Sequence, residues 1–205
     1  TPALVDIDGI KVLISEADLQ DYPGMYLQGA PEEFTLKGKF PRVVVEEEQT
    51  SDRDVRPVNR AGYIAKTTGD RNFPWRVIAI ASDDGELLTN QMIYLLSEPC
   101  RIEDPSWIRP GKVAWDWWNF NNIYGVDFEA GINTETYKYY IDFASDFGIE
   151  YIILDEGWYD LGDLTSVNPD IDMQELLAYG REKGVGIILW VVWKTLDDQL
   201  GEVMH

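Results

Sequence analysis

Tryptophan and carboxylate side chains cluster at three points in the second half of the sequence. The clusters are residues 115–119 (WDWWN), residues 155–158 (DEGW), and a third set made of Trp190, Trp193 and Lys194. Six of the eight tryptophans lie in them. Indole rings stack on the apolar faces of sugar rings, and carboxylates accept hydrogen bonds from hydroxyl groups. The combination indicates a carbohydrate site, the alternative being core tryptophans beside a solvated acidic pair.

The adjacent carboxylates Asp155 and Glu156 limit what chemistry this cluster can perform. Hydrolysis of a glycosidic bond requires two carboxyl groups on opposite sides of the bond. Neighbouring residues of one strand point to opposite faces and cannot span it, so at most one of the pair is catalytic. The interpretation we favour is that one carboxylate binds sugar hydroxyls and the other is tied to a neighbouring loop.

The rest of the composition excludes several other classes of site. The 205 residues contain one cysteine, Cys100, and one histidine, His205, which excludes an intramolecular disulfide, Cys/His metal sites and a nucleophile activated by histidine. Carboxylate chemistry and oxygen-ligated metals remain. The formal net charge of −20 argues against nucleic acid or an anionic membrane as a partner. Residues 112–205 carry 18 acidic and 5 basic side chains, and therefore most of this charge.

The three clusters follow apolar strands that recur at a fixed interval. Strands are predicted over residues 113–118, 149–154 and 185–193, starting 36 residues apart. Helices are expected between them, from Asn133 or Thr134 to Phe147 before Gly148, and over residues 171–183 with Asp170 as cap and Gly184 as stop. Inward-facing side chains of these helices are predicted to be Tyr137, Tyr140, Ile141, Ala144, Phe147, Met173, Leu176 and Leu177. Continuous apolar strands alternating with helices indicate a parallel sheet whose carboxyl ends gather the clusters at one edge.

The first hundred residues read as all-β. Asp8-Gly9 between residues 4–7 and 10–14 predicts a hairpin with a type I′ turn. Further strands are predicted over residues 43–46, 62–66, 76–81 and 91–96, with a turn at residues 83–85 and a linker over residues 99–105. Glu46, Glu47 and Glu48 are interpreted as a solvated edge, not a metal site, because successive strand residues point to opposite faces. The chain thus combines all-β and α/β parts, with fewer residues than the roughly 250 of a complete barrel, and is expected to be a fragment.

Residues 13–19 are interpreted as a strand running into a helical turn. Ser15 and Asp18 have the spacing of a variant capping box. The alternative is that a carboxylate here reaches a hard, oxygen-ligated ion such as calcium.

An ordered set of motifs resembles glycoside hydrolase family 97. The motifs are residues 15–19 (SEADL), 22–25 (YPGM), 73–76 (FPWR), 107–119 (WIRPGKVAWDWWN) and 151–158 (YIILDEGW). The family comprises calcium-dependent α-glucosidases and α-galactosidases. Its members join an N-terminal β-supersandwich to a (β/α)8 TIM-type barrel. The resemblance implies that residues 1–104 are the end of the supersandwich and residues 105–205 the first three strands of the catalytic barrel.

The resemblance also implies roles for individual residues. Glu16 matches a glutamate that ligates the calcium ion, and Glu156 matches a strand-two glutamate at the sugar site. Residues 190–194 (WVVWK) lack the glutamate base that inverting members carry at the end of strand three. This absence points to the retaining branch, whose aspartate nucleophile on strand four and glutamate acid/base would lie beyond His205. From strand-end position and resemblance together, the predicted substrate-binding residues are Asp116, Trp118, Glu156, Trp158, Trp190 and Lys194.

The function expected from these observations is an exo-acting, calcium-dependent, retaining α-galactosidase. Its substrate would be an oligosaccharide or other α-galactoside, and this chain alone is expected to be inactive. The alternatives are an α-glucosidase of the same family and a non-catalytic carbohydrate-binding protein. The resemblance further implies an exported, periplasmic bacterial enzyme, whose signal segment would precede Thr1.

Overall fold

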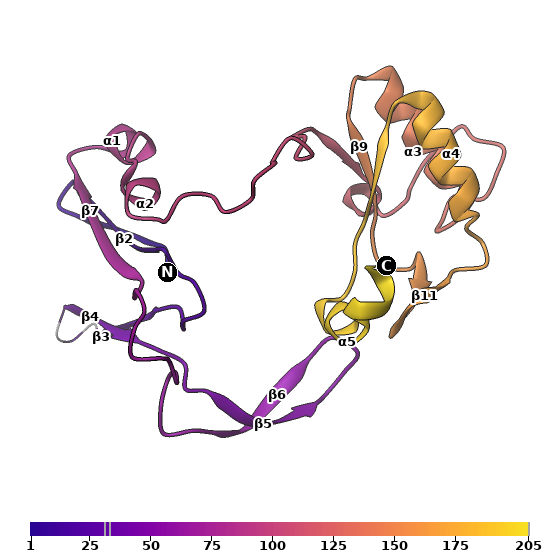
Figure 1. Ribbon diagram of the computed structural model, residues 1–205. Helices are drawn as coiled ribbons and strands as arrows, with labels where there is room; N and C mark the ends of the chain where they lie inside the picture. The colour runs from indigo at the N-terminus through magenta and orange to yellow at the C-terminus, as the bar shows by residue number, and fades with distance from the viewer. Residues whose placement is uncertain (31, 33, 205) are drawn as a thin grey trace. The chain divides into compact units, whose positions relative to one another are not determined.

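The computed structural model describes residues 1–30, 32 and 34–204. The chain divides into two compact units, which are described separately (Figure 1). The first unit comprises residues 1–48 and 57–104, and the second comprises residues 49–56 and the chain from Pro105 onward. No helix of the described residues has the length and apolar character needed to cross a membrane.

The first unit is built on a three-stranded antiparallel sheet of order β1-β2-β7. The strands are β1 (Ala3–Ile7), β2 (Ile10–Ala17) and β7 (Trp75–Ala81). The predicted hairpin is confirmed, because Ile7 pairs with Ile10 across a two-residue turn. The turn residues Asp8 and Gly9 have φ values of 52° and 90°, as a type I′ turn requires.

Two further hairpins follow β2 along the chain. Strand β3 (Tyr26–Ala30) pairs with β4 (Thr35–Lys39), and β5 (Val44–Gln49) pairs with β6 (Val55–Arg60). Every residue of β5 is exposed, so the acidic run Glu46–Glu48 lies on a solvated strand, as predicted.

Three predictions for the first hundred residues are wrong. Residues 62–66 form no strand, because β6 already pairs with β5 and ends at Arg60. Residues 91–96 contain a short helix, α2 (Met92–Leu95), whose first amide donates to Asn90 Oδ1 at 2.9 Å. The expected turn at residues 83–85 opens helix α1 (Asp84–Leu88), since the Asp83 carboxylate accepts hydrogen bonds from two amides of its first turn. Short apolar runs such as residues 91–96 are ambiguous between strand and helix, and the Asp83 cap starts α1 where only a turn was predicted.

The second unit contains the predicted parallel sheet, of order β12-β9-β8. Along the chain, α3 connects β8 to β9, and α4 precedes β12. The two helices lie side by side (Figure 1). A small antiparallel hairpin, β10-β11, follows β9 and was not predicted. The elements are β8 (Val113–Trp115), the 3-10 helix η2 (Asp116–Asn119), α3 (Thr134–Asp146), β9 (Tyr151–Leu154), β10 (Tyr159–Asp160), β11 (Asp163–Val167), α4 (Met173–Lys183), β12 (Gly186–Leu189) and α5 (Trp193–Val203).

Side-chain caps and left-handed glycines set the helix ends. Asn133 caps α3 by accepting a hydrogen bond from the Thr136 amide, and Gly148 follows the helix with φ 64°, as predicted. Gly184, with φ 71°, ends α4 as predicted. The N-cap of α4 is Asp172 and not Asp170, because its carboxylate accepts from the Glu175 amide.

The core of the second unit lies between the helices and the sheet. Its fully buried members include Tyr137 and Ile141 of α3, Ile152 and Leu154 of β9, and Leu176 of α4. The prediction that Phe147 and Leu177 lie in the core is wrong. Phe147 is 68% exposed at the end of α3, where its ring packs on that of Phe143, and Leu177 of α4 is 41% exposed.

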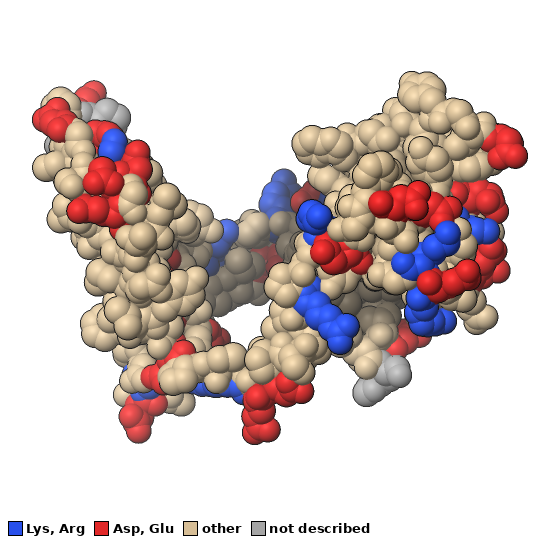
Figure 2. All heavy atoms as spheres, turned by 90° about the horizontal axis from the view of Figure 1, so that it is seen from above, with Lys and Arg blue, Asp and Glu red and all other residues tan. Residues whose placement is uncertain are grey.

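Charged side chains connect α3 and α4 on the surface. Lys183 Nζ lies 2.7 Å from Asp142 Oδ1, and the Tyr179 hydroxyl donates to the same oxygen at 2.8 Å. Acidic and basic side chains are interspersed on the face of this unit that Figure 2 shows. Such exposed pairs contribute little free energy each.

The Asp142 pair makes a testable contribution to the pH dependence of stability. Partial burial alone would raise the pKa of Asp142, but the hydrogen bonds from Lys183 and Tyr179 lower it below its ordinary value of 3.8. A depressed acid pKa stabilises the folded state above the unfolded pKa, and this stability is lost as the pH falls through the folded pKa. We expect Asp142→Asn to lower the free energy of unfolding at pH 7 by less than about 1 kcal/mol, as for other exposed pairs, and so to lower the unfolding temperature slightly. In a series of thermal melts the difference from wild type should begin to shrink near pH 3.8, the unfolded value, and disappear once the pH is below the lowered pKa of the folded state. A difference that does not shrink as the pH falls from 7 through this range would contradict this origin.

Candidate active site

The carboxyl ends of β8 and β9 lie side by side in the parallel sheet. Trp115 of β8 pairs with Ile153 of β9, so that residues 115–119 and 155–158 meet at one edge, as predicted. The Trp115 indole Nε1 donates to Asp155 Oδ2 at 2.6 Å. The first two sequence clusters are thus one structural cluster.

Asp116 lies beneath this edge and is 2% exposed. Its Oδ2 accepts from the Tyr137 hydroxyl at 2.9 Å and, at 3.4 Å, from the Asp155 amide. Its Oδ1 accepts from the Trp117 amide at 2.8 Å. Burial raises the pKa of Asp116, and the three hydrogen bonds oppose that shift. Asp116 offers little surface to a substrate, and its predicted contact with a sugar stays a prediction.

The acidic pair is divided between two roles in the structure. Asp155 is tied down by the Trp115 indole, and its Oδ1 accepts from the Glu156 amide at 2.7 Å. The Glu156 side chain is 39% exposed, and its Oε1 lies 2.8 Å from Arg53 Nη2, an ion pair within the second unit. Hydrogen bonding to Glu156 is the main cause that raises the pKa of Arg53. The tied carboxylate of the sequence-based interpretation is therefore Asp155, and Glu156 is the accessible group, whose binding of sugar hydroxyls stays a prediction.

The tryptophans of the cluster differ in exposure. Trp118 is 85% exposed, and its ring centroid is 6.4 Å from that of Trp115. Trp158 is 5% exposed and belongs to the core; its Nε1 donates to the Trp190 carbonyl at 2.7 Å. Trp190 is partly buried directly after β12. Trp118 therefore has the surface that stacking on a sugar ring needs, whereas Trp158 fixes the end of β12 from within.

Only Trp190 of the third cluster lies directly after a strand. The strand predicted over residues 185–193 ends at Leu189, and Trp193 and Lys194 begin helix α5. Lys194 Nζ forms an ion pair with Asp198, four residues later on that helix. Substrate binding by Trp190 and Lys194 stays a prediction.

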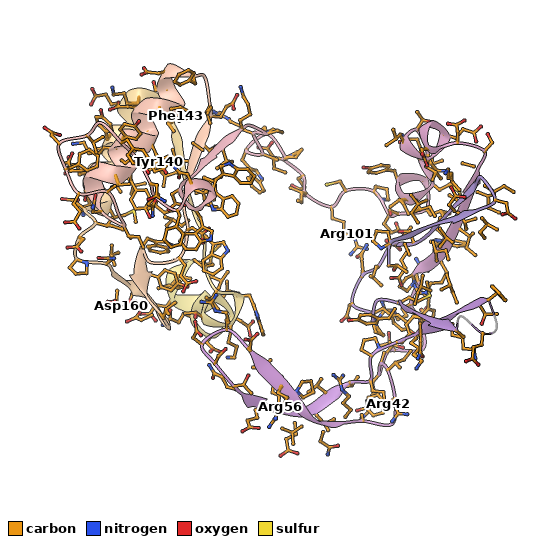
Figure 3. The ribbon with its side chains drawn as sticks, turned by 180° about the vertical axis from the view of Figure 1, so that it is seen from behind. Arg42, Arg56, Arg101, Tyr140, Phe143 and Asp160 are labelled. Carbon is orange, nitrogen blue, oxygen red and sulfur yellow. The ribbon has the colours of Figure 1, made fainter. Side chains whose placement is uncertain are left out.

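An apolar groove of about 730 Å³ runs beside the first cluster, residues 115–119, along β8 and α3. Its lining includes Trp115, Trp118 and Tyr124. Helix α3 contributes Tyr140 and Phe143, both labelled in Figure 3. Within the described residues β8 pairs only with β9, so one wall of the groove is an edge strand.

Glu16 lies in the first unit, within strand β2. The predicted helical turn is wrong, since β2 continues through Ala17 and Asp18 has a left-handed φ of 53°. The Glu16 side chain is 7% exposed; Oε1 lies 2.8 Å from Arg76 Nη1, and Oε2 accepts from the Thr1 hydroxyl at 2.6 Å. The Met25 amide donates to both oxygens. Burial alone would raise the pKa of Glu16, but these hydrogen bonds and the Arg76 charge lower it.

The described residues do not by themselves form a calcium site at Glu16. No group of three His, Cys, Asp or Glu side chains in the described part of the chain is placed to hold a metal ion. A calcium ion needs six to eight oxygen ligands, and the Glu16 oxygens already face a guanidinium. Calcium binding here would require further ligands and a displaced Arg76.

Two residues that contact the cluster, Tyr137 and Arg53, were not identified as such from the sequence. Tyr137 was predicted as core, and its helical spacing gave no sign that its hydroxyl reaches Asp116. Arg53 lies 103 positions from Glu156 in the chain, and no local pattern connects the two.

Comparisons with known proteins match both halves of the chain. The model described as "Glycosyl-hydrolase 97 N-terminal" matches residues 1–99, and the model "Glycoside hydrolase 97" matches residues 117–205. A protein of Bacteroides thetaiotaomicron named retaining alpha-galactosidase is 45% identical over 208 residues, covering 98% of this chain and 31% of that protein. A probable retaining alpha-galactosidase of Streptomyces bingchenggensis is 34% identical over 136 residues, covering 63% of this chain and 20% of its own length.

A solved structure shows the same similarity. A family 97 enzyme of Pseudoalteromonas sp. strain K8, determined in complex with acarbose, aligns with a TM-score of 0.67 at 28% identity. The alignment covers 91% of this chain and 28% of that enzyme. The chain therefore spans about a third or less of the length of the relatives that it matches.

Proposed function

We propose, since the chain belongs to glycoside hydrolase family 97, that the full-length protein is an exo-acting hydrolase that removes terminal α-linked galactose with retention of configuration. The observation that carries this proposal is the 45% identity, over 98% of the chain, to a protein named retaining alpha-galactosidase. The sequence after β12 supports the same branch, because residues 190–194 contain no carboxylate that could serve as the base of an inverting enzyme.

The architecture supports a place for these residues in a longer catalytic domain. We propose that residues 1–104 end a β-supersandwich and that residues 105–205 begin a (β/α)8 barrel. In the described residues, β8 and β12 each pair with β9 alone, and β8 lines the apolar groove. Parallel strands are normally buried on both faces and paired on both sides, which further strands of a barrel would provide.

In the proposed reaction two carboxyl groups act in turn. A carboxylate nucleophile attacks the anomeric carbon while a carboxylic acid protonates the leaving oxygen, and water then hydrolyses the glycosyl-enzyme. We place both groups outside the present chain. The chain's own contribution would be recognition, with the Glu156 carboxylate accepting hydrogen bonds from sugar hydroxyls and Trp118 stacking on the ring. Trp190 and Lys194 complete the proposed substrate-binding set, and Asp116 and Trp158, which are 2% and 5% exposed, would support it from within the fold.

Parallel assays of the full-length enzyme on aryl α-galactoside and aryl α-glucoside test the proposal. We expect turnover of the galactoside, with the α-anomer of galactose as the first product seen by proton NMR. Preference for the glucoside would indicate the glucosidase alternative, and binding without turnover would indicate a carbohydrate-binding protein. The present 205-residue chain alone should not turn over either substrate.

The proposal also includes calcium as cofactor, with Glu16 as one ligand. In the full-length enzyme, Glu16→Gln should raise the calcium concentration needed for half-maximal activity about tenfold or more, because a neutral amide is a weaker ligand for a hard cation. Titration of calcium into chelator-treated wild type and variant measures this shift. Superimposable titrations would instead assign Glu16 to the ion pair with Arg76 alone.

A further inference from the structure

The Asp116 carboxylate is buried without a cation beside it. It is 2% exposed, and none of the ion pairs found among the described residues includes it. A buried carboxyl group without a counter-charge destabilises a fold unless hydrogen bonds compensate it. The side chains around it, Tyr137 and Tyr140, belong to the otherwise apolar core. The burial of Asp116 therefore depends on its hydrogen bonds, and these bonds order the groups around it.

The hydrogen bonds of Asp116 connect three elements of the second unit. Tyr137 reaches it from α3, Trp117 donates from η2, and the Asp155 amide donates from the end of β9. Burial, with the nearby Asp116 charge, raises the pKa of Tyr137, which keeps the phenol protonated as a donor. The carboxylate therefore links α3 and η2 to the point where the chain leaves β9, through an amide hydrogen bond of 3.4 Å.

Glu156 is the next residue after this anchor. Its amide donates to Asp155 Oδ1, and Asp155 Oδ2 is in turn held by the Trp115 indole. Asp155, the residue before Glu156, is thus held at its amide by Asp116 and at its carboxylate by Trp115. On the C-terminal side Gly157 has φ 111°, a left-handed conformation that turns the chain away from the strand.

We propose that Tyr137 and Asp116 form a buried clamp that positions Glu156 for the sugar. This inference rests on the proposed function for its catalytic consequence. Asp116 then acts through Asp155 as a positioning residue and needs no contact with the substrate. A shift of 1 Å in a binding group can lower a rate about a hundredfold, so a clamp of this kind has a measurable effect.

Tyr137→Phe in the full-length enzyme tests the clamp, with Tyr140→Phe as matched control. Both tyrosines lie on α3 and are 7% exposed or less. The Tyr140 hydroxyl donates to Asn119 Oδ1 and to the Asp116 carbonyl, but not to the Asp116 carboxylate. Each variant thus removes one tyrosine hydroxyl from α3, but only Tyr137→Phe removes a hydrogen bond to the Asp116 carboxylate.

Two measurements are made on each variant. We expect Tyr137→Phe to accelerate backbone hydrogen exchange about tenfold in a peptide spanning residues 151–158, and to lower kcat/KM for aryl α-galactoside about tenfold. Tyr140→Phe should change each quantity less than about twofold. If Tyr137→Phe does not fold, Asp116→Asn replaces it. The asparagine side chain carries no charge, so the Asp155 amide and the Tyr137 hydroxyl lose the charged acceptor that they share.

The outcomes separate this inference from the proposed function. Unchanged exchange in the 151–158 peptide, or equal effects of the two tyrosine variants, would overturn the clamp. Faster exchange with unchanged kcat/KM would also overturn it, because Glu156 would then not depend on the anchor. If wild type hydrolyses no α-galactoside, the proposed function fails, and the exchange comparison still decides whether the clamp exists.

Discussion

Replacement of Glu156 by glutamine in the full-length enzyme should lower kcat/KM for aryl α-galactoside about 100-fold, equivalent to about 2.7 kcal/mol. Glu156 is the accessible carboxylate of the strand-end cluster, with 39% of its side chain exposed. Glutamine preserves the shape of the group but replaces one acceptor oxygen by a donor. A sugar hydroxyl that donates to the carboxylate would then meet an N–H group, and the charge that strengthens the bond is lost.

The Arg53 ion pair requires a variant of its own in this test. Arg53 Nη2 lies 2.8 Å from Glu156 Oε1, so Glu156→Gln also weakens that pair. Arg53→Met keeps the carboxylate and removes only its partner. Because both side chains are well exposed, we expect Arg53→Met to change kcat/KM less than about fivefold. A loss equal to that of Glu156→Gln would assign the effect to the ion pair and not to substrate contact.

Glu150 provides the matched control at the opposite end of the same strand. It precedes β9, and its Oε2 accepts from the Lys112 amide at 2.7 Å. A glutamine can accept the same hydrogen bond through its amide oxygen. Steady-state kinetics of Glu150→Gln should therefore differ from wild type less than about twofold. A large loss in both glutamine variants would show that negative charge on this strand matters without regard to position.

The parallel βα part was predictable because local and tertiary signals agree there. Strands 113–115, 151–154 and 186–189 are short apolar runs, and Asn133, Gly148 and Gly184 mark the helix ends around them. Each of these signals acts within a few residues of the boundary that it sets. The edge of the sheet that gathers Trp115 and Asp155 follows from the parallel order alone.

The errors fall where one short pattern fits two structures. The apolar residues 190–193 continue the β12 pattern, yet the strand stops at Leu189 and α5 begins at Trp193. Trp158, which follows the left-handed Gly157, enters the core, and its predicted contact with a sugar stays a prediction. Contacts such as Arg53 with Glu156 join residues far apart in sequence, and a single sequence contains no signal for them.

Gly180→Ala should destabilise the protein by about 2 kcal/mol, although alanine is the better helix former by about 1 kcal/mol. Gly180 is buried in α4, near its C-terminal end. A Cβ at this position would lie 2.8 Å from the Val185 carbonyl oxygen. That oxygen belongs to the backbone leading into β12, and the Val185 amide donates to the Gly180 carbonyl at 2.8 Å. The contact cannot be relieved by rotating a side chain, so α4 must move away from the sheet.

Gly201→Ala is the matched substitution without that contact. Gly201 lies in α5, is exposed, and has nothing within 4 Å of the position of an added Cβ. Here the helix propensity should act alone and stabilise the protein by about 1 kcal/mol. Thermal melts of the full-length protein should show the unfolding temperature falling for Gly180→Ala and rising slightly for Gly201→Ala. A rise for both would mean that α4 does not approach β12 as closely as the structure shows, and the carboxyl edge that β9 and β12 share would then need another description.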